Sequence, residues 1–324
     1  MLADSAHRAQ SWGRYWAAGS RHSCPASFEG HYGSATQAFW RDCFAGLGAE
    51  DCVLELGCGN GSLVRYLLES RGELPCAYEA VDLAPLDSRW VQALPPSARQ
   101  QLRVHAQTDA ADLPVGPASI TRLYAQFALE YFADPAVWAE LSRVLAPGAG
   151  IGLVLHHQDS VLAKAAQAES AHCAWLLGEG GPLDQAEAIL PHLWQRTARP
   201  QDPPGPEAQS ARARFNKSFA QLEQRASTEP TPDVLHESAR QVMAILGQLQ
   251  SSGMASAQEQ LSALRQSLRD NQLRVEELCQ AALDEASLKD WEQSLGAIGV
   301  HNVIRGEIHE NGHLFGWTLS GSRI

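Results

Sequence analysis

The sequence predicts an α/β protein built on a seven-stranded, mostly parallel sheet, with a long helical insertion toward its C-terminal end. Three observations support this fold class. Short apolar runs alternate with helical stretches over residues 51–158, which is typical of parallel strands joined by right-handed crossovers. Two further strand-like runs flank the pair Asn311-Gly312, a strong hairpin signal. Residues 159–285 are rich in Gln, Ala, Ser and Glu and have a helical pattern almost throughout.

The parallel part of the sheet follows from the regular succession of apolar runs. Residues 1–50, rich in aromatic side chains, predict a helical N-terminal cap. The first strand is expected over residues 52–56 and ends at a glycine-rich loop. A helix is expected over residues 62–69, because leucine and valine recur there at i,i+4 spacing. The later elements of this part are strands over residues 77–81, 102–105, 120–125 and 151–155 and a helix over residues 135–145.

The last forty residues return to the α/β pattern. A helix is expected over residues 288–295, and two antiparallel strands over residues 303–308 and 314–319. The α/β domain therefore combines residues 51–158 with residues 286–324, and the insertion separates its fifth strand from its last helix.

Two apolar stripes order the helical insertion. Spacings of three and four residues alternate along each stripe, and Gly253 lies between them. This pattern is typical of two antiparallel helices with a knobs-into-holes seam. We expect the insertion to act as a lid or as the contact of a homodimer. The stripes are Leu235, Ser238, Val242, Ile245 and Leu249, and Leu261, Leu264, Leu268, Asn271, Val275, Leu278 and Ala282.

Composition argues against several classes of protein. The formal net charge of −12 makes nucleic-acid binding improbable, since phosphate binding calls for a basic face. No apolar run reaches the roughly 18 residues of a membrane span, and the N-terminus lacks the apolar core of a signal peptide. The seven cysteines form no Cys-x-x-Cys pair, which indicates free thiols and no metal site. We expect a cytoplasmic protein without a membrane or nucleic-acid partner.

A glycine-rich loop carries the chemistry. Gly57, Gly59 and Gly61 lie directly after the first strand and before a helix, where backbone N–H groups can approach a ligand without an intervening Cβ. Asp82 ends the second strand about 20 residues further on, the place of a ribose-binding acid. After the third strand, a carboxylate within residues 108–114 can accept a hydrogen bond from an adenine amino group.

A nicotinamide dehydrogenase also carries an acid at the end of its second strand, so this class of enzyme has to be considered as an alternative. Its fingerprint needs glycine or alanine at the sixth position of the loop, and Ser62 occupies that position here. Glu55 lies two residues before the first glycine. The spacing therefore argues against a dehydrogenase.

The chain carries five motifs in a fixed order, namely VLELGCGNG (53–61), VDL (81–83), TDAADLP (108–114), AQFALEYF (125–132) and LAPGAGIGLVLHH (145–157). In this order they resemble class I S-adenosylmethionine-dependent methyltransferases, and the resemblance covers residues 51–158 well and the C-terminal hairpin loosely. It implies a Rossmann-like sheet of order 3-2-1-4-5-7-6 with strand 7 antiparallel, and S-adenosyl-L-methionine as the cofactor. One departure is Ser119, where many relatives open the fourth strand with an acid.

The resemblance also implies cofactor contacts for particular residues. Asp82 would bind the ribose, Leu83 would pack on the adenine face, and Gln126 would lie near the sulfonium. The N-terminal segment covers the pocket in similar methyltransferases, and we expect Tyr15 to contact the cofactor. The other expected cofactor-binding residues are Gly57, Cys58 and Gly59 along the methionine part, Asp109 and Ala110 at the adenine, and Glu55 ahead of the glycines.

Methyl transfer is an in-line displacement, so the protein must mainly hold the nucleophile in line and exclude water. A base is needed only if the acceptor keeps its proton at neutral pH. The candidates are His156 and His157 after the fifth strand and Glu130 after the fourth. Each has a structural alternative, since histidines also pack in cores and a carboxylate suits the first turn of a helix.

The sequence therefore predicts a methyltransferase acting on a small-molecule acceptor. An RNA- or protein-modifying methyltransferase, with the insertion as its docking arm, is the first alternative. A cofactor-binding interaction protein without catalysis is the second, and a nicotinamide oxidoreductase is the last.

Overall fold

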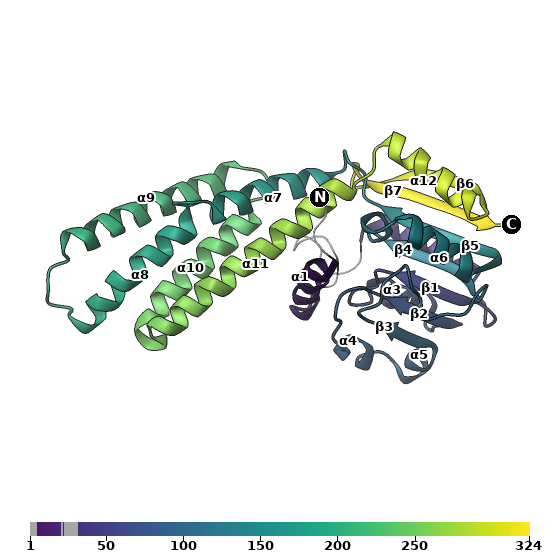
Figure 1. Cartoon of the computed structure of the whole chain (residues 1–324), viewed down its shortest axis with the longest axis horizontal. Coiled ribbons are helices and arrows are strands. Elements are labelled where there is room, and N and C mark those ends of the chain that lie inside the picture. Colours follow the sequence, from purple (N-terminus) through teal and green to yellow (C-terminus); the bar gives the residue numbers. More distant parts are fainter. Residues whose placement is uncertain (1–4, 21, 23–31) are drawn as a thin grey trace. The chain divides into compact units, whose positions relative to one another are not determined.

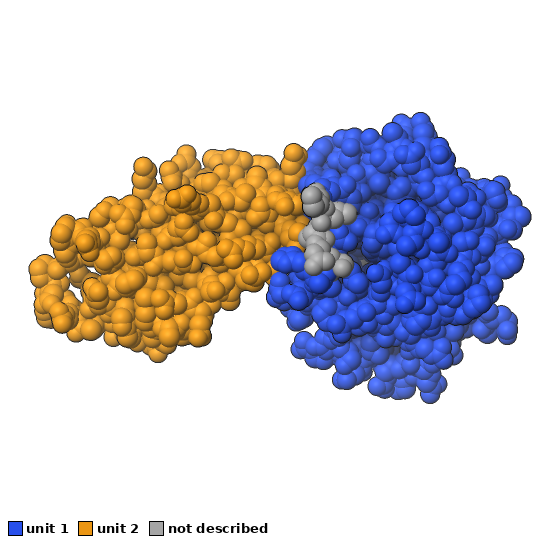
Figure 2. Space-filling view, in the orientation of Figure 1, with its two compact units in different colours: residues 1–164, 277–324 blue, residues 165–276 orange. Residues whose placement is uncertain are grey.

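The computed structural model describes residues 5–20, 22 and 32–324 of the chain (Figure 1). It contains two compact units, which Figure 2 colours separately: unit 1 is residues 1–164 and 277–324, and unit 2 is residues 165–276. None of the described helices combines the length and the apolar character that a membrane crossing requires.

Unit 1 is built on one seven-stranded sheet of order β3-β2-β1-β4-β5-β7-β6. The first five strands are parallel, and β7 is antiparallel to both β5 and β6, which confirms the expected fold class. The strands are β1 (Cys52–Leu56), β2 (Ala77–Val81), β3 (Leu102–His105), β4 (Ile120–Gln126), β5 (Leu145–Leu155), β6 (Val300–Glu310) and β7 (His313–Arg323). The helices that lie wholly in unit 1 are α1 (Ser5–Ala17), α2 (Ser34–Ala45), α3 (Ser62–Arg71), α4 (Arg89–Gln92), α5 (Pro96–Gln101), η1 (Leu129–Tyr131), α6 (Pro135–Val144) and α12 (Glu285–Ala297).

Alternating side chains of β1 supply two apolar cores, because neighbouring residues of a strand point to opposite faces. Val53 belongs to a core that includes Trp40 of α2 and Leu63 of α3. Leu54 belongs to a second core, with Leu141 of α6. Helices therefore cover both faces of the sheet, and a ligand has to enter at the carboxyl ends of the strands.

Strand β5 is longer than expected, because it starts at Leu145 and runs through Pro147 and Gly148. The sequence predicted this strand only over residues 151–155. Pairing with β4 is irregular at this point and becomes regular from Gly150 onward, and Pro147 is exposed. A proline is tolerated where a strand is irregular, since no ladder hydrogen bond is lost there.

The borders of unit 2 differ from residues 159 and 285, which were expected for the insertion. Helix α7 (Val161–Leu177) begins in unit 1, where Leu162 belongs to an apolar core. Helix α11 (Met254–Ala281) ends in unit 1, where Glu277 pairs with Arg8. A helical sequence pattern predicts where a helix runs, but it does not predict which unit each turn of the helix packs against.

Unit 2 has a core of its own, to which five helices contribute. The apolar residues of the first stripe and Leu261, Leu264 and Leu268 of the second belong to it, together with side chains of α7, α8 (Pro182–Ala198) and α9 (Pro206–Thr228). The second stripe runs on beyond this core, since Leu278 and Ala282 already belong to unit 1. Helices α10 (Asp233–Ser252) and α11 carry the stripes and are joined at Gly253. The stripes thus serve a five-helix core and not only a two-helix seam. Asn271 is satisfied within the unit, because its side-chain amide donates to Glu169 Oε1 at 2.6 Å.

Candidate functional site

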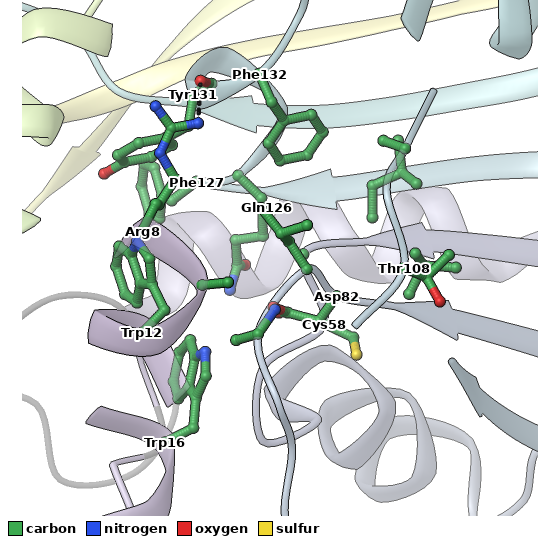
Figure 3. A pocket seen from close by; sticks show the side chains of 18 of the residues that line it. Arg8, Trp12, Trp16, Cys58, Asp82, Thr108, Gln126, Phe127, Tyr131 and Phe132 are labelled. Carbon is green, nitrogen blue, oxygen red and sulfur yellow. Dashed lines mark hydrogen bonds between the residues drawn. The ribbon is translucent and has the colours of Figure 1, made fainter. Parts of the chain in front are cut away.

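A pocket opens at the carboxyl ends of β1, β2 and β4 and encloses about 910 Å³ of empty space, including its mouth. Figure 3 shows Cys58, Asp82 and Thr108 toward one end, Tyr131 and Phe132 toward the other, and Gln126 between them. Helix α1 forms one side with Arg8, Trp12 and Trp16. The pocket therefore joins the glycine loop to an aromatic space under an N-terminal helix.

The glycine loop can take its path only with glycine at key positions. Gly57 and Gly59 have φ values of 70° and 48°, in the left-handed region that side chains disfavour. A Cβ on Gly57 would lie 2.3 Å from that of Ala128, and a Cβ on Gly59 would lie 2.6 Å from the Trp16 ring. The loop is held to the neighbouring strand, since the N–H groups of Gly57 and Cys58 donate to the Val81 carbonyl.

Asp82 holds the loop as well as facing the pocket. Its Oδ2 accepts from the Gly59 N–H and its Oδ1 from the Ala84 N–H, both at 2.8 Å. Burial raises the pKa of Asp82 to about 6, although these two bonds oppose the shift. Asp82 is 9% exposed, and each carboxylate oxygen keeps a second lone pair that a ribose hydroxyl can use.

Helix α1 is fastened at both ends. The side-chain amide of Asn60, in the glycine loop, donates to the carbonyls of Trp16 at 2.9 Å and Ser20 at 2.7 Å. At the other end, Arg8 Nε donates to Glu277 Oε1 at 2.9 Å. Trp12 and Trp16 stack with ring centroids 5.6 Å apart between these two points. The helix is therefore positioned as one wall of the pocket.

Gln126 ends β4 with a defined amide orientation. The Trp40 indole N–H, which can only donate, gives its hydrogen to Gln126 Oε1 at 2.6 Å. The amide NH2 is therefore the group that remains for a ligand. Phe127 follows with φ 51°, an unusual value for a bulky residue and one that clusters at functional sites.

Seven of the expected cofactor-binding residues line this pocket: Gly57, Cys58, Asp82, Leu83, Asp109, Ala110 and Gln126. Gly59 is not among the lining residues, since it lies against Trp16. Glu55 points into the core and accepts from the Tyr78 hydroxyl at 2.8 Å. Tyr15 lies off the pocket wall and donates to the His22 carbonyl at 2.6 Å. The structure thus places Gly59, Glu55 and Tyr15 outside the pocket lining.

None of the three catalytic candidates lines the pocket. His156 is fully buried, stacks 4.4 Å from the Phe127 ring, and has its pKa lowered to about 3 by burial. His157 stacks 4.2 Å from Trp317. Glu130 accepts from the His156 backbone N–H at 2.8 Å, and burial raises its pKa to about 7. In this structure these side chains support the walls of the site.

Several lining residues were missed by the sequence reasoning. Arg8 and Phe132 were not singled out, and Trp12 and Trp16 were passed over for Tyr15. Residues 8, 12 and 16 are four apart and share one face of a helix, so this spacing was a usable signal. The tie between Asn60 and α1 had no local signal, because its partners lie some forty residues away.

The sequence and fold have known relatives. Residues 53–148 match a family described as a methyltransferase domain. The malonyl-[acyl-carrier protein] O-methyltransferase of Hahella chejuensis (strain KCTC 2396) is 35% identical over 107 residues, which are 32% of this chain and 36% of that protein. The chain thus matches about a third of the length of this curated relative.

Two solved structures resemble the whole chain weakly. A SAM-dependent methyltransferase from Aquifex aeolicus has a TM-score of 0.43 at 10% identity, over 90% of each chain. Geranyl diphosphate C-methyltransferase from Streptomyces coelicolor A3(2) has a TM-score of 0.36 at 12% identity, over 90% of this chain and 76% of that one.

The family match and the strand order agree with the motifs of the glycine loop. Residues 53–148 are a methyltransferase domain of class I, and S-adenosylmethionine is the cofactor of this domain.

Proposed function

We propose that this protein is an S-adenosylmethionine-dependent methyltransferase whose acceptor is a small molecule. One observation carries the proposal: the pocket that contains the glycine loop and Asp82 continues past Gln126 into a space walled by Trp12 and Tyr131. The bound cofactor supplies an electrophilic methyl group on sulfur. The residues of the chain bind and orient both molecules and exclude water from the reacting atoms.

Two features favour a small acceptor. The far end of the pocket is lined by aromatic rings, including Trp12, Phe127, Tyr131 and Phe132, which suits a ligand with an apolar body. The net charge of −12 opposes the docking of a polyanion such as RNA. The curated relative is named an O-methyltransferase, which supports methyl transfer as the reaction class.

Two measurements test the proposal. Isothermal titration should show saturable binding of S-adenosylhomocysteine and none of NAD. The full-length protein, given methyl-labelled cofactor, should then pass label to the low-mass fraction of a bacterial extract. Label found only in protein or RNA would contradict the small acceptor, and binding without any label transfer would indicate an interaction protein instead of an enzyme.

A further inference from the structure

Beyond the glycine loop, the pocket offers hydrogen-bond donors at two fixed points, Gln126 in its middle and Arg8 at its far end. Trp40 fixes the Gln126 amide so that its NH2 group is left for a ligand. Arg8 uses Nε for Glu277 and Nη1 for the Tyr131 carbonyl at 3.4 Å. Among the described residues, Nη2 of Arg8 has no hydrogen-bond partner, and the side chain lines the pocket. A ligand in this part of the pocket therefore meets donors that call for accepting oxygens.

Few of the described residues that line the pocket can act as a general base. Both oxygens of Asp82 already accept backbone N–H groups. Asp109 is exposed and follows Thr108, which lies at the glycine-loop end of the pocket. His22 also lines the pocket and would be needed only by an acceptor that still carries its proton. A carboxylic acid has lost its proton at neutral pH and needs no base.

The charges around the pocket also favour an anionic acceptor. Arg8 and Glu277 are 12% and 2% exposed and neutralise each other, so the Arg8 end is not strongly cationic by itself. A bound cofactor would add the positive charge of its sulfonium, which an anionic acceptor would neutralise. The surrounding rings of Trp12, Tyr131 and Phe132 suit an apolar body on that anion.

We propose that the acceptor is a carboxylic acid with an apolar body, held at the Arg8 end of the pocket and converted to its methyl ester. The inference rests on the proposed function. One carboxylate oxygen forms a bond to the methyl carbon, and the bond from that carbon to sulfur breaks with its electron pair on sulfur. No proton is transferred, and the two opposite charges are lost together.

The chemical test uses the alkali lability of methyl esters. The full-length protein is incubated with cofactor tritiated in the methyl group and the low-mass fraction of a bacterial extract, and the products are then treated with alkali. We expect the label to appear as volatile methanol. Label that stays non-volatile, as on nitrogen, carbon or an ether oxygen, overturns the carboxylate while the proposed function stands. An absence of transfer refutes the proposed function, and this inference with it.

The role of Arg8 is tested by graded dilution of the same extract. Arg8→Met should raise the half-saturating amount of extract by roughly ten- to a hundredfold, while the affinity for S-adenosylhomocysteine stays within about twofold. Arg14→Met, on the exposed side of the same helix, is the matched control. The reverse split, with weaker S-adenosylhomocysteine binding and unchanged use of extract, would assign Arg8 to the cofactor and overturn the proposal.

Removing Arg8 alone leaves Glu277 buried without its cation, which can unfold the region. The double variant Arg8→Met with Glu277→Met removes both charges and keeps the test valid. It should bind S-adenosylhomocysteine as the wild type does and show the same rise in the half-saturating amount of extract. Normal use of the extract by this folded double variant would also overturn the proposal.

Discussion

At the scale of single residues, some side chains of the pocket both face the ligand space and form a hydrogen bond within the protein. Asp82 faces the cofactor end and also holds the backbone of Gly59 and Ala84. Gln126 offers its amide to a ligand and is oriented by Trp40. The sequence identified Asp82 and Gln126 by position, but their second contacts come from the packing of distant segments.

Asp82→Ala should reduce both binding and stability. The loss of a charged acceptor should weaken S-adenosylhomocysteine by about ten- to a hundredfold. The structure buries Asp82, so its replacement should affect folding as well. Two backbone N–H groups lose their acceptor, which costs roughly 1–3 kcal/mol each when they stay buried.

The measurements for Asp82 are titration calorimetry and urea unfolding. Asp109→Ala is the control, since Asp109 lines the same pocket but is exposed, and it should lower affinity without lowering stability. Equal stability of the Asp82→Ala protein and the wild type would show that the loop holds its path without the carboxylate.

Trp40→Phe should impair turnover through Gln126. The ring stays in the core, but the N–H that fixes the amide is lost, so the amide can turn its oxygen toward the ligand. A hydrogen bond of this kind contributes about 0.5–1.5 kcal/mol, or roughly two- to tenfold in kcat/KM.

The control for Trp40 is Trp90→Phe, because the Trp90 indole N–H has no hydrogen-bond partner among the described residues. Steady-state kinetics should show the loss for the first variant only. Equal losses in the two proteins would point to packing instead of amide orientation.

Glu55→Gln should change how stability depends on pH. Burial raises the pKa of Glu55 from 4.5 to about 8, although the Tyr78 hydrogen bond opposes this. A raised carboxyl pKa means that its contribution to stability is full below pH 4.5 and is lost as the pH rises through about 8. Glutamine keeps an acceptor for Tyr78 and carries no charge.

Urea unfolding at several pH values would measure this effect. The glutamine variant should gain stability relative to the wild type as the pH rises from 4.5 toward 8. A stability difference that stays constant across this window would mean that Glu55 titrates normally in the folded protein.

At the scale of elements, the N-terminal helices are held by groups from remote parts of unit 1. Helix α1 is tied to the glycine loop by Asn60 and to the end of α11 by Glu277. Helix α2 begins without a cap from its own N-cap residue, Gly33. Its cap is Glu310 of β6, whose Oε1 accepts from the Thr36 N–H and hydroxyl, both at 2.8 Å.

Glu310→Ala should therefore destabilise unit 1. Glu310 is 8% exposed, and its removal leaves helix N–H groups of α2 without an acceptor and removes a negative charge that favours the helix N-terminus. We expect a loss of roughly 1–3 kcal/mol in the free energy of unfolding.

Chemical denaturation would measure this loss. Glu307→Ala on the same strand is the matched control, because that side chain is 43% exposed, and it should change stability by less than about 0.5 kcal/mol. A loss as small as that of the control would show that α2 is held by its apolar contacts alone.

At the scale of the whole molecule, the chain has two units with separate cores. All lining residues of the pocket that the structure describes belong to unit 1. The core of unit 2 contains Leu264 and Leu268, which are 5% and 4% exposed. Replacing both leucines by lysine would place charges in this core and unfold unit 2. Such a variant could therefore not show whether the chain forms a dimer through the insertion.

Replacing residues 165–276 by a flexible Gly-Ser linker should leave S-adenosylhomocysteine binding intact, because all described lining residues belong to unit 1. The proposed role of the insertion as a lid predicts that turnover is lost in the same protein. Calorimetry and label transfer measure the two. Full turnover without unit 2 would show that it is not part of the active site.

The proposed homodimer is a separate question and is answered by sedimentation of the full chain. Met243 is 52% exposed on α10, so Met243→Glu changes the surface of unit 2 without opening its core. A dimer that becomes monomeric in this variant would support a contact through the insertion.

The sequence by itself determined the fold class, the strand order through the family motifs, and seven of the pocket-lining residues. These features are local, since periodic apolar runs define strands and helices and a short glycine loop requires its own residues. The N-terminal wall was predicted as a region, but Tyr15 was chosen although Trp12 and Trp16 lie on the helix face that meets the loop.

Only the tertiary structure decided which titratable groups reach the pocket. His156 and Glu130 follow strands that end at the site, yet burial behind Phe127 takes one imidazole away from it, and a backbone hydrogen bond holds the carboxylate. Arg8 enters the pocket because Glu277, more than 250 residues away in the chain, fixes it there. A one-dimensional pattern shows where a strand ends, whereas the direction of a side chain depends on what packs against it.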